Sequence, residues 1–170
     1  RAAAESIISW FKTTHYTKRV QWLRGTKGSG KSVLLRHISH FCVQQSALAA
    51  GFSFHPHKPD DYGHFLRHFL PTILAQISES PRFPSFRTSL SDLGRDPDPT
   101  TPSPLKGSHN TPKQLYGKPL QNQFEALLKP AWDGMTEKDR EMPLLIVLDG
   151  LDHCHAGGLV LSWMLGFIRN

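Results

Sequence analysis

The chain has 170 residues, of which 38% are hydrophobic and 20% charged, and its formal net charge is +6 with histidine neutral. These values indicate one soluble globular domain, long enough to bury a core without disulfides or metals. They exclude a membrane-spanning helix, because no run of 18 apolar residues is present. Residues 1–6 do not resemble a signal peptide, since a glutamate and polar residues interrupt any apolar run.

The basic charge suits an anionic partner such as phosphate. Lysines and arginines are scattered and form no run, so we expect no nucleic-acid interface. Two cysteines, Cys42 and Cys154, give no disulfide framework, and we expect a reducing, cytoplasmic environment. The chain begins without Met and ends at Asn170 within an apolar pattern, so we expect it to be part of a longer protein.

The first half of the chain alternates between apolar patterns with helical spacing and short runs typical of strands. The predicted elements are helices over 2–12, 31–45 and 62–79, and strands over 19–24 and 47–54. Pro71 falls inside the third helix, which it should kink or split.

The stretch 81–119 contains eight of the thirteen prolines. We expect it to be a largely irregular insertion, because such a segment buries too little apolar surface to offset its ordering entropy. After it, the pattern predicts a helix over 120–129, a strand over 144–148 and a helix over 158–169. The run Leu144-Leu-Ile-Val-Leu148 is typical of a strand buried on both faces, as in a parallel sheet. Alternating strands and helices predict an α/β fold across residues 1–170.

Residues 25–32, Gly-Thr-Lys-Gly-Ser-Gly-Lys-Ser, match the Walker A pattern of phosphate-binding loops. Glycines let such a loop curl around an anion, so that its amides and the following helix N-terminus face the phosphates. We expect Lys31 to contact the β- and γ-phosphates and Ser32 to bind Mg²⁺. The predicted nucleotide-binding residues are Gly25, Thr26, Lys27, Gly28, Ser29, Gly30, Lys31, Ser32 and Val33.

A second metal anchor is predicted at the end of the apolar strand, where Asp149 follows Leu148. An aspartate in this position of a P-loop protein supports Mg²⁺, and Asp152 is placed to polarise an attacking water. A helix cap is the alternative role for Asp149. The His55-Pro-His57 and His153-Cys-His155 pairs match no zinc-finger spacing, so we expect no structural metal.

Trp22 to Ser32, together with Leu148-Asp-Gly-Leu-Asp-His-Cys154, resembles the NACHT domain of STAND-type signalling ATPases, in particular the nephrocystin-type NACHT abundant in fungi. The resemblance covers roughly residues 5–168 apart from the proline-rich stretch. It implies a P-loop NTPase fold, a three-layer α/β/α sandwich with a central parallel sheet. In similar domains the N-terminal segment lies next to the nucleotide, so Trp10, Phe11, Tyr16 or Trp22 is a candidate contact for the base.

The resemblance also implies a function. ATP, or GTP, with Mg²⁺ would control self-association of an intracellular receptor in innate immunity or incompatibility, and hydrolysis would reset it. Asp152 and the following residue would belong to the part of the site that takes part in hydrolysis. This chain has His153 where the family usually has Glu. We therefore expect slow hydrolysis. The arginine-bearing strand that contacts the γ-phosphate in the family would lie after Asn170.

Two other functions remain open on the same residues. One is a nucleotide-bound scaffold that does not hydrolyse, which the histidine at position 153 keeps possible. The other is a general P-loop ATPase that acts on nucleic acid, for which DNA- or RNA-stimulated hydrolysis would be the sign.

Overall fold

A computed structural model describes most of the chain outside the proline-rich stretch, namely residues 2–12, 20–44, 48–54, 62–93, 118–142, 144–154 and 157–169. At its centre, β1 (Leu48–Ser53) and β2 (Leu145–Asp149) form a parallel sheet. The two strands end together, because Ser53 lies opposite Asp149. A mixed α/β architecture is thus confirmed, with a sheet of two strands in the described residues.

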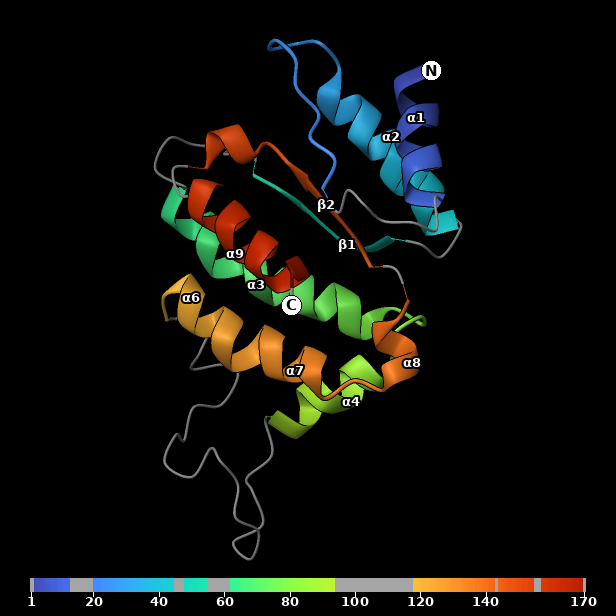
Figure 1. The fold of residues 1–170 in the computed structure, drawn as a ribbon. Helices are drawn as coiled ribbons and strands as arrows, with labels where there is room; N and C mark the ends of the chain where they lie inside the picture. Colours follow the sequence, from blue (N-terminus) through green and yellow to red (C-terminus); the bar gives the residue numbers. More distant parts are fainter. Residues whose placement is uncertain are drawn as a thin grey trace, which may run out of the picture.

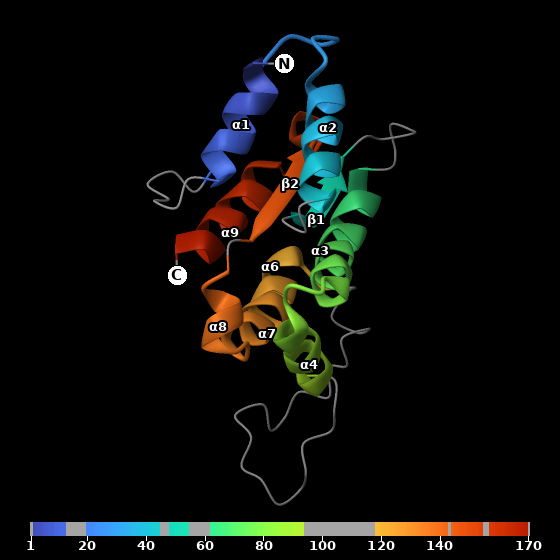
Figure 2. The same ribbon diagram turned by 90° about the vertical axis from the view of Figure 1, so that its right-hand side faces the viewer.

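Helices pack on both faces of this sheet (Figures 1 and 2). On one face, α2 (Lys31–Gln44) buries Ile38 and Cys42 against Leu48 of β1 and Leu145 of β2, and α1 (Ala2–Lys12) packs beside α2. On the other face, α3 (Tyr62–Glu79) and α9 (Gly157–Arg169) join the main core. None of the described helices is long and apolar enough to cross a membrane.

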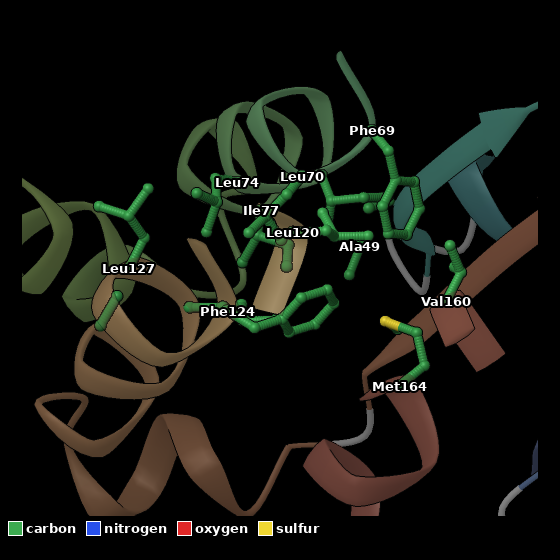
Figure 3. Close-up of a cluster of buried hydrophobic side chains, with 14 of the residues drawn as sticks. Ala49, Phe69, Leu70, Leu74, Ile77, Leu120, Phe124, Leu127, Val160 and Met164 are labelled. Atoms are coloured by element: carbon green, nitrogen blue, oxygen red, sulfur yellow. The ribbon is translucent and has the colours of Figure 1, made fainter. Parts of the chain in front are cut away.

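The main core lies between α3, the sheet and the helices that follow residue 118 (Figure 3). Phe69 of α3 is fully buried, with its ring centroid 5.5 Å from that of Phe54 and 6.5 Å from that of Phe124. The ring centroid of Phe124 also lies 6.0 Å from that of Trp163 in α9. These contacts hold α9, and with it the chain that leaves β2, against the sheet.

The outer edge of β1 is covered by a side chain of α3. The backbone N–H of Gly51 donates to Oε1 of Gln76 at 2.7 Å. This amide would otherwise be an open hydrogen-bond donor at the edge of the sheet, as on any unpaired edge strand.

Part of the proline-rich stretch is ordered, which corrects the prediction of an irregular insertion from residue 81. Helix α4 (Pro84–Leu93) begins with a proline, a residue that suits the first helical turn. Phe83 and Phe86 are fully buried. Their spacing, continued by Leu90 and Leu93, places four apolar side chains toward the core. Residues 94–117 lie outside the described part.

Most residues between 118 and 142 are helical. They form α6 (Leu120–Gln123), a π-helical turn (Phe124–Leu128), α7 (Lys129–Asp133) and α8 (Glu137–Arg140). Pro130 has no N–H to donate to an earlier carbonyl, and Lys129 N–H bonds to the carbonyl of Phe124 five residues back. The widened turn therefore lies next to a proline.

Three further expectations are corrected. Residues 20–24 form no strand, since no neighbouring strand of the described part pairs with them. Pro71 does not split α3, because fully buried Phe69, Leu70 and Ile73 hold the helix on both sides of it. The five residues of β2 are half-buried rather than buried on both faces.

Candidate functional site

The loop before α2 is shaped by glycines in two different ways. Gly28 and Gly30 have φ angles of 79° and 82°, in the left-handed region that other residues resist. At Gly25 the reason is space: a Cβ there would lie 2.7 Å from Oγ of Ser29. The Ser29 N–H also donates to the Thr26 carbonyl at 3.2 Å. The loop thus curls back on itself as its sequence predicts.

This loop leads directly into the N-terminus of α2. The first helical hydrogen bond runs from Leu34 N–H to the Gly30 carbonyl at 2.9 Å. The amides of Lys31, Ser32 and Val33 therefore have no intrahelical partner. No acidic residue lies in the first turn of α2. The positive end of the helix dipole is accordingly available to an external anion.

The ammonium of Lys31 is turned back onto its own loop. Its Nζ donates to the Gly25 carbonyl at 2.9 Å and to the Thr26 carbonyl at 2.8 Å. The aliphatic part of the side chain follows the same course, because a Cβ at Gly25 would lie 3.7 Å from Cδ of Lys31. Lys31 is therefore bound to the start of the loop that it follows.

The acidic end of β2 is held by the sheet on one side and by a tight turn on the other. The Asp149 carbonyl accepts from Phe54 N–H at 2.8 Å, which fixes the end of β2 against β1. Gly150 then has a φ of 72°, and a 3₁₀ turn (Leu151–His153) begins. Asp149 is half-buried, whereas Asp152 and His153 are exposed.

A cavity of about 1340 Å³ brings the two motifs to one space. Gly25 and Lys31 line it from the loop, and Asp149 and Asp152 line it from the end of β2. The remaining predicted site residues are described but do not line it; they are Thr26, Lys27, Gly28, Ser29, Gly30, Ser32, Val33 and His153. Of these, Ser32 is half-buried and the others are exposed.

Aromatic side chains from several elements also line the cavity. Trp10, Phe11 and Trp22, three candidates for a base contact, line it from the N-terminal part of the chain. Tyr16, the fourth, lies outside the described residues. The sequence did not suggest four further lining residues, which come from helices far along the chain: Phe124, Lys129, Trp132 and Trp163. No local motif marks these residues, because only the fold brings them to the cavity.

The described residues contain no group of three or more His, Cys, Asp or Glu side chains that would hold a metal. His153 and the buried thiol of Cys154 therefore form no such cluster there, while His55, His57 and His155 lie outside the described part. Burial raises the pKa of the other thiol, Cys42, which keeps it protonated and unsuited to metal binding.

Comparison with known proteins gives one match. The family model described as nephrocystin 3, N-terminal, matches residues 3–170, almost the whole chain. No curated protein and no solved structure matches the chain significantly. The family match agrees with the NACHT resemblance of the two motifs that line the cavity. By this match, the chain belongs to the nephrocystin 3 N-terminal family.

Proposed function

We propose that the chain binds a nucleoside triphosphate, ATP or else GTP, together with Mg²⁺, and acts as a nucleotide-dependent switch. One observation carries the proposal: Gly25 and Lys31 share a cavity with Asp149 and Asp152, although more than 100 residues separate the two motifs. A phosphate loop and an acidic strand end facing one space are the two parts that P-loop NTPases require.

In this proposal the amides of the loop from Gly25 to Gly30, and those of the first turn of α2, bind phosphate oxygens. Lys31 neutralises the charge of the β- and γ-phosphates, since its ammonium has a third N–H donor besides the two bonded to loop carbonyls. Trp10, Phe11 or Trp22 provides an apolar contact for the base from the same cavity.

Ser32 and Asp149 carry the oxygen donors that Mg²⁺ prefers, and Asp149 is the one that lines the cavity. Ser32 lies in the first turn of α2 and Asp149 at the end of β2, and both are half-buried. Protein-bound Mg²⁺ keeps several waters and shares its remaining positions between one or two protein oxygens and substrate phosphates. A dedicated cluster of three acidic ligands is therefore not needed. The ion would neutralise phosphate charge during transfer.

Beyond binding, we propose that the fold is a P-loop three-layer α/β/α sandwich and that the nucleotide state controls self-association in a cytoplasmic signalling receptor. Support comes from the helices on both faces of the parallel sheet and from the family match. Asp152 would polarise the attacking water. His153, exposed where similar domains carry Glu, would make hydrolysis slow.

Titration calorimetry with ATP and GTP, each with Mg²⁺, tests the proposal. The Lys31→Ala variant should bind at least about 100-fold more weakly, because each charge-assisted hydrogen bond to phosphate is worth more than 1 kcal/mol. Arg36→Ala is the matched control, since Arg36 is an exposed cation on the same helix and does not line the cavity. Unchanged affinity in Lys31→Ala would sink the assignment.

A non-hydrolysing scaffold is the second candidate, favoured by His153. It predicts that bound triphosphate stays intact through many hours with the full-length protein. The third, a general ATPase on nucleic acid, predicts that added DNA or RNA raises the rate of phosphate release. Light scattering distinguishes the switch from both, because only the switch predicts that ATP controls the formation of dimers or higher oligomers.

A further inference from the structure

Helix α9 begins with two glycines whose surroundings differ. A Cβ added at Gly157 would lie 2.5 Å from the carbonyl oxygen of Leu151 and 3.3 Å from its Cγ. A Cβ at Gly158 would have no described atom within 4 Å beyond its own stretch of helix. Glycine is a poor helix former, and close packing against the turn after β2 explains its presence at position 157 but not at position 158.

The oxygen that such a Cβ would meet is part of the 3₁₀ turn itself. The Leu151 carbonyl accepts from Cys154 N–H at 3.2 Å, and the Cys154 carbonyl accepts from Gly157 N–H at 2.8 Å. Two successive hydrogen bonds therefore join the turn to the start of α9. Because a Cβ cannot lie 2.5 Å from a backbone oxygen, a side chain at position 157 would force this carbonyl or the helix to move.

The Leu151 carbonyl belongs to the peptide group that precedes Asp152. A peptide group is planar, so the oxygen of Leu151 moves together with the nitrogen and the Cα of Asp152. Asp152 lines the large cavity and also a smaller one of about 200 Å³, which Gly157 and Gly158 line as well. Displacement of this carbonyl would therefore change where the Asp152 carboxylate lies in the large cavity.

We propose that Gly157 is a positioning residue for Asp152: the close contact between α9 and Leu151 sets the place of the Asp152 carboxylate. This inference rests on the proposed function, because it takes Asp152 to polarise the attacking water. Gly157 does not line the large cavity, so it acts only through the peptide group that joins Leu151 to Asp152. We expect its effect on hydrolysis rather than on binding, because the phosphate loop is a separate part of the chain.

The first test needs no ligand and uses the thiol of Cys154, which is 8% exposed at the end of the turn. Cys42, the other cysteine, is replaced by alanine, so that an aromatic disulfide reagent reports on Cys154 alone. In this background Gly157→Ala should raise the labelling rate about three- to tenfold, because opening of the turn exposes the thiol. Gly158→Ala should react like the Cys42→Ala parent. Equal rates in all three proteins would show that the contact does not hold the turn and would overturn the proposal.

The second test measures nucleotide affinity by calorimetry and hydrolysis by single-turnover phosphate release, both with the full-length protein. Gly157→Ala should hydrolyse ATP about 10- to 100-fold more slowly than the wild type with affinity unchanged within about twofold, because a displacement of about 1 Å in a reacting group has an effect of this size. Gly158→Ala should match the wild type in both. In the Asp152→Asn background, Gly157→Ala should slow hydrolysis no further, since the carboxylate through which it acts is already lost.

The outcomes separate this proposal from the proposed function. If Gly157→Ala hydrolyses ATP at the wild-type rate, the positioning role is wrong and the proposed function stands. A further loss of rate when Gly157→Ala is added to Asp152→Asn also overturns the role, because it shows a general effect on the fold. If the wild type binds no nucleotide or leaves it intact, the proposed switch fails together with the role in hydrolysis, while the labelling of Cys154 still decides whether Gly157 sets the position of the turn.

Discussion

The carboxylate of Asp139 in α8 accepts hydrogen bonds from both the backbone N–H and the hydroxyl of Ser85 in α4, 54 residues earlier. The Ser85 hydroxyl oxygen in turn accepts from Thr136 N–H at 3.2 Å. One buried carboxylate and one serine thus join the first turns of two short helices. Neither helix is long enough to be stable alone, so each depends on this contact and on its apolar neighbours.

The Asp139 contact predicts a pH-dependent stability. The hydrogen bonds from Ser85 hold the pKa of the Asp139 carboxyl below its usual range. Its stabilisation is therefore complete above the ordinary aspartate pKa of about 3.9, and it is lost as the pH falls through the lowered folded-state pKa. Asp139→Asn should lower the melting temperature at pH 7 and reduce its decrease in acid. Equal melting curves for variant and wild type from pH 7 to pH 2 would contradict this role.

Replacing Gly150 should lower the stability of the fold because of the backbone conformation at this position. Its φ of 72° costs a residue with a Cβ about 1–2 kcal/mol of folding free energy. Gly150→Ala should be destabilised by this amount in urea unfolding, and it should also bind nucleotide more weakly, because the turn positions Asp149 and Asp152. Gly166→Ala is the matched control. Gly166 lies in α9 with nothing within 4 Å of an added Cβ, so alanine there should stabilise by about 0.5–1 kcal/mol. An unchanged free energy of unfolding in Gly150→Ala would contradict the role of the φ angle at that position.

Asp149→Asn should remove the contribution of Mg²⁺ to nucleotide affinity. We expect affinity with Mg²⁺ to fall about 10- to 100-fold, with little change in EDTA, because only the metal contact is altered. Calorimetry under both conditions measures this. Asp133→Asn serves for comparison, because Asp133 lines the same cavity in an exposed ion pair with Lys129 at 3.1 Å. If Asp149→Asn weakens binding equally with and without Mg²⁺, its role is structural, such as capping the turn after β2.

His153→Glu should raise the rate of hydrolysis without changing affinity. A glutamate restores the residue that similar domains carry, and a positioned general base contributes about 100- to 10,000-fold. We expect an increase of at least about tenfold in single-turnover phosphate release from ATP. The exposed His37→Glu on α2 controls for added negative charge. No increase in His153→Glu would favour the scaffold over the switch.

The glycine loop and the strand that ends at Asp149 were predictable from sequence because their conformations depend on local residues. Gly28 and Gly30 have left-handed φ angles, and the run that ends at Asp149 is a strand parallel to β1. Helix α4 was obscured by the prolines around it, since the prediction weighed composition over the apolar spacing of Phe83 and Phe86.

Features that depend on partners distant in sequence were not predictable. Residues 20–24 have a strand-like pattern, but a strand forms only where another strand pairs with it. The wall of the cavity from Phe124 and Trp163 similarly follows from the packing of α6, the π-helical turn and α9.

The two edges of the sheet differ, because the Gly51 N–H at the edge of β1 is already hydrogen-bonded to Gln76. Any strand that added beside β1 would have to displace the half-buried Gln76 side chain and leave its Oε1 without the Gly51 N–H donor. Along β2, the side chains instead line the cavity, and no described strand lies there. Within the described residues, the edge of the sheet at β1 is therefore covered at Gly51, whereas the side chains of β2 line the cavity that Gly25 and Lys31 also line.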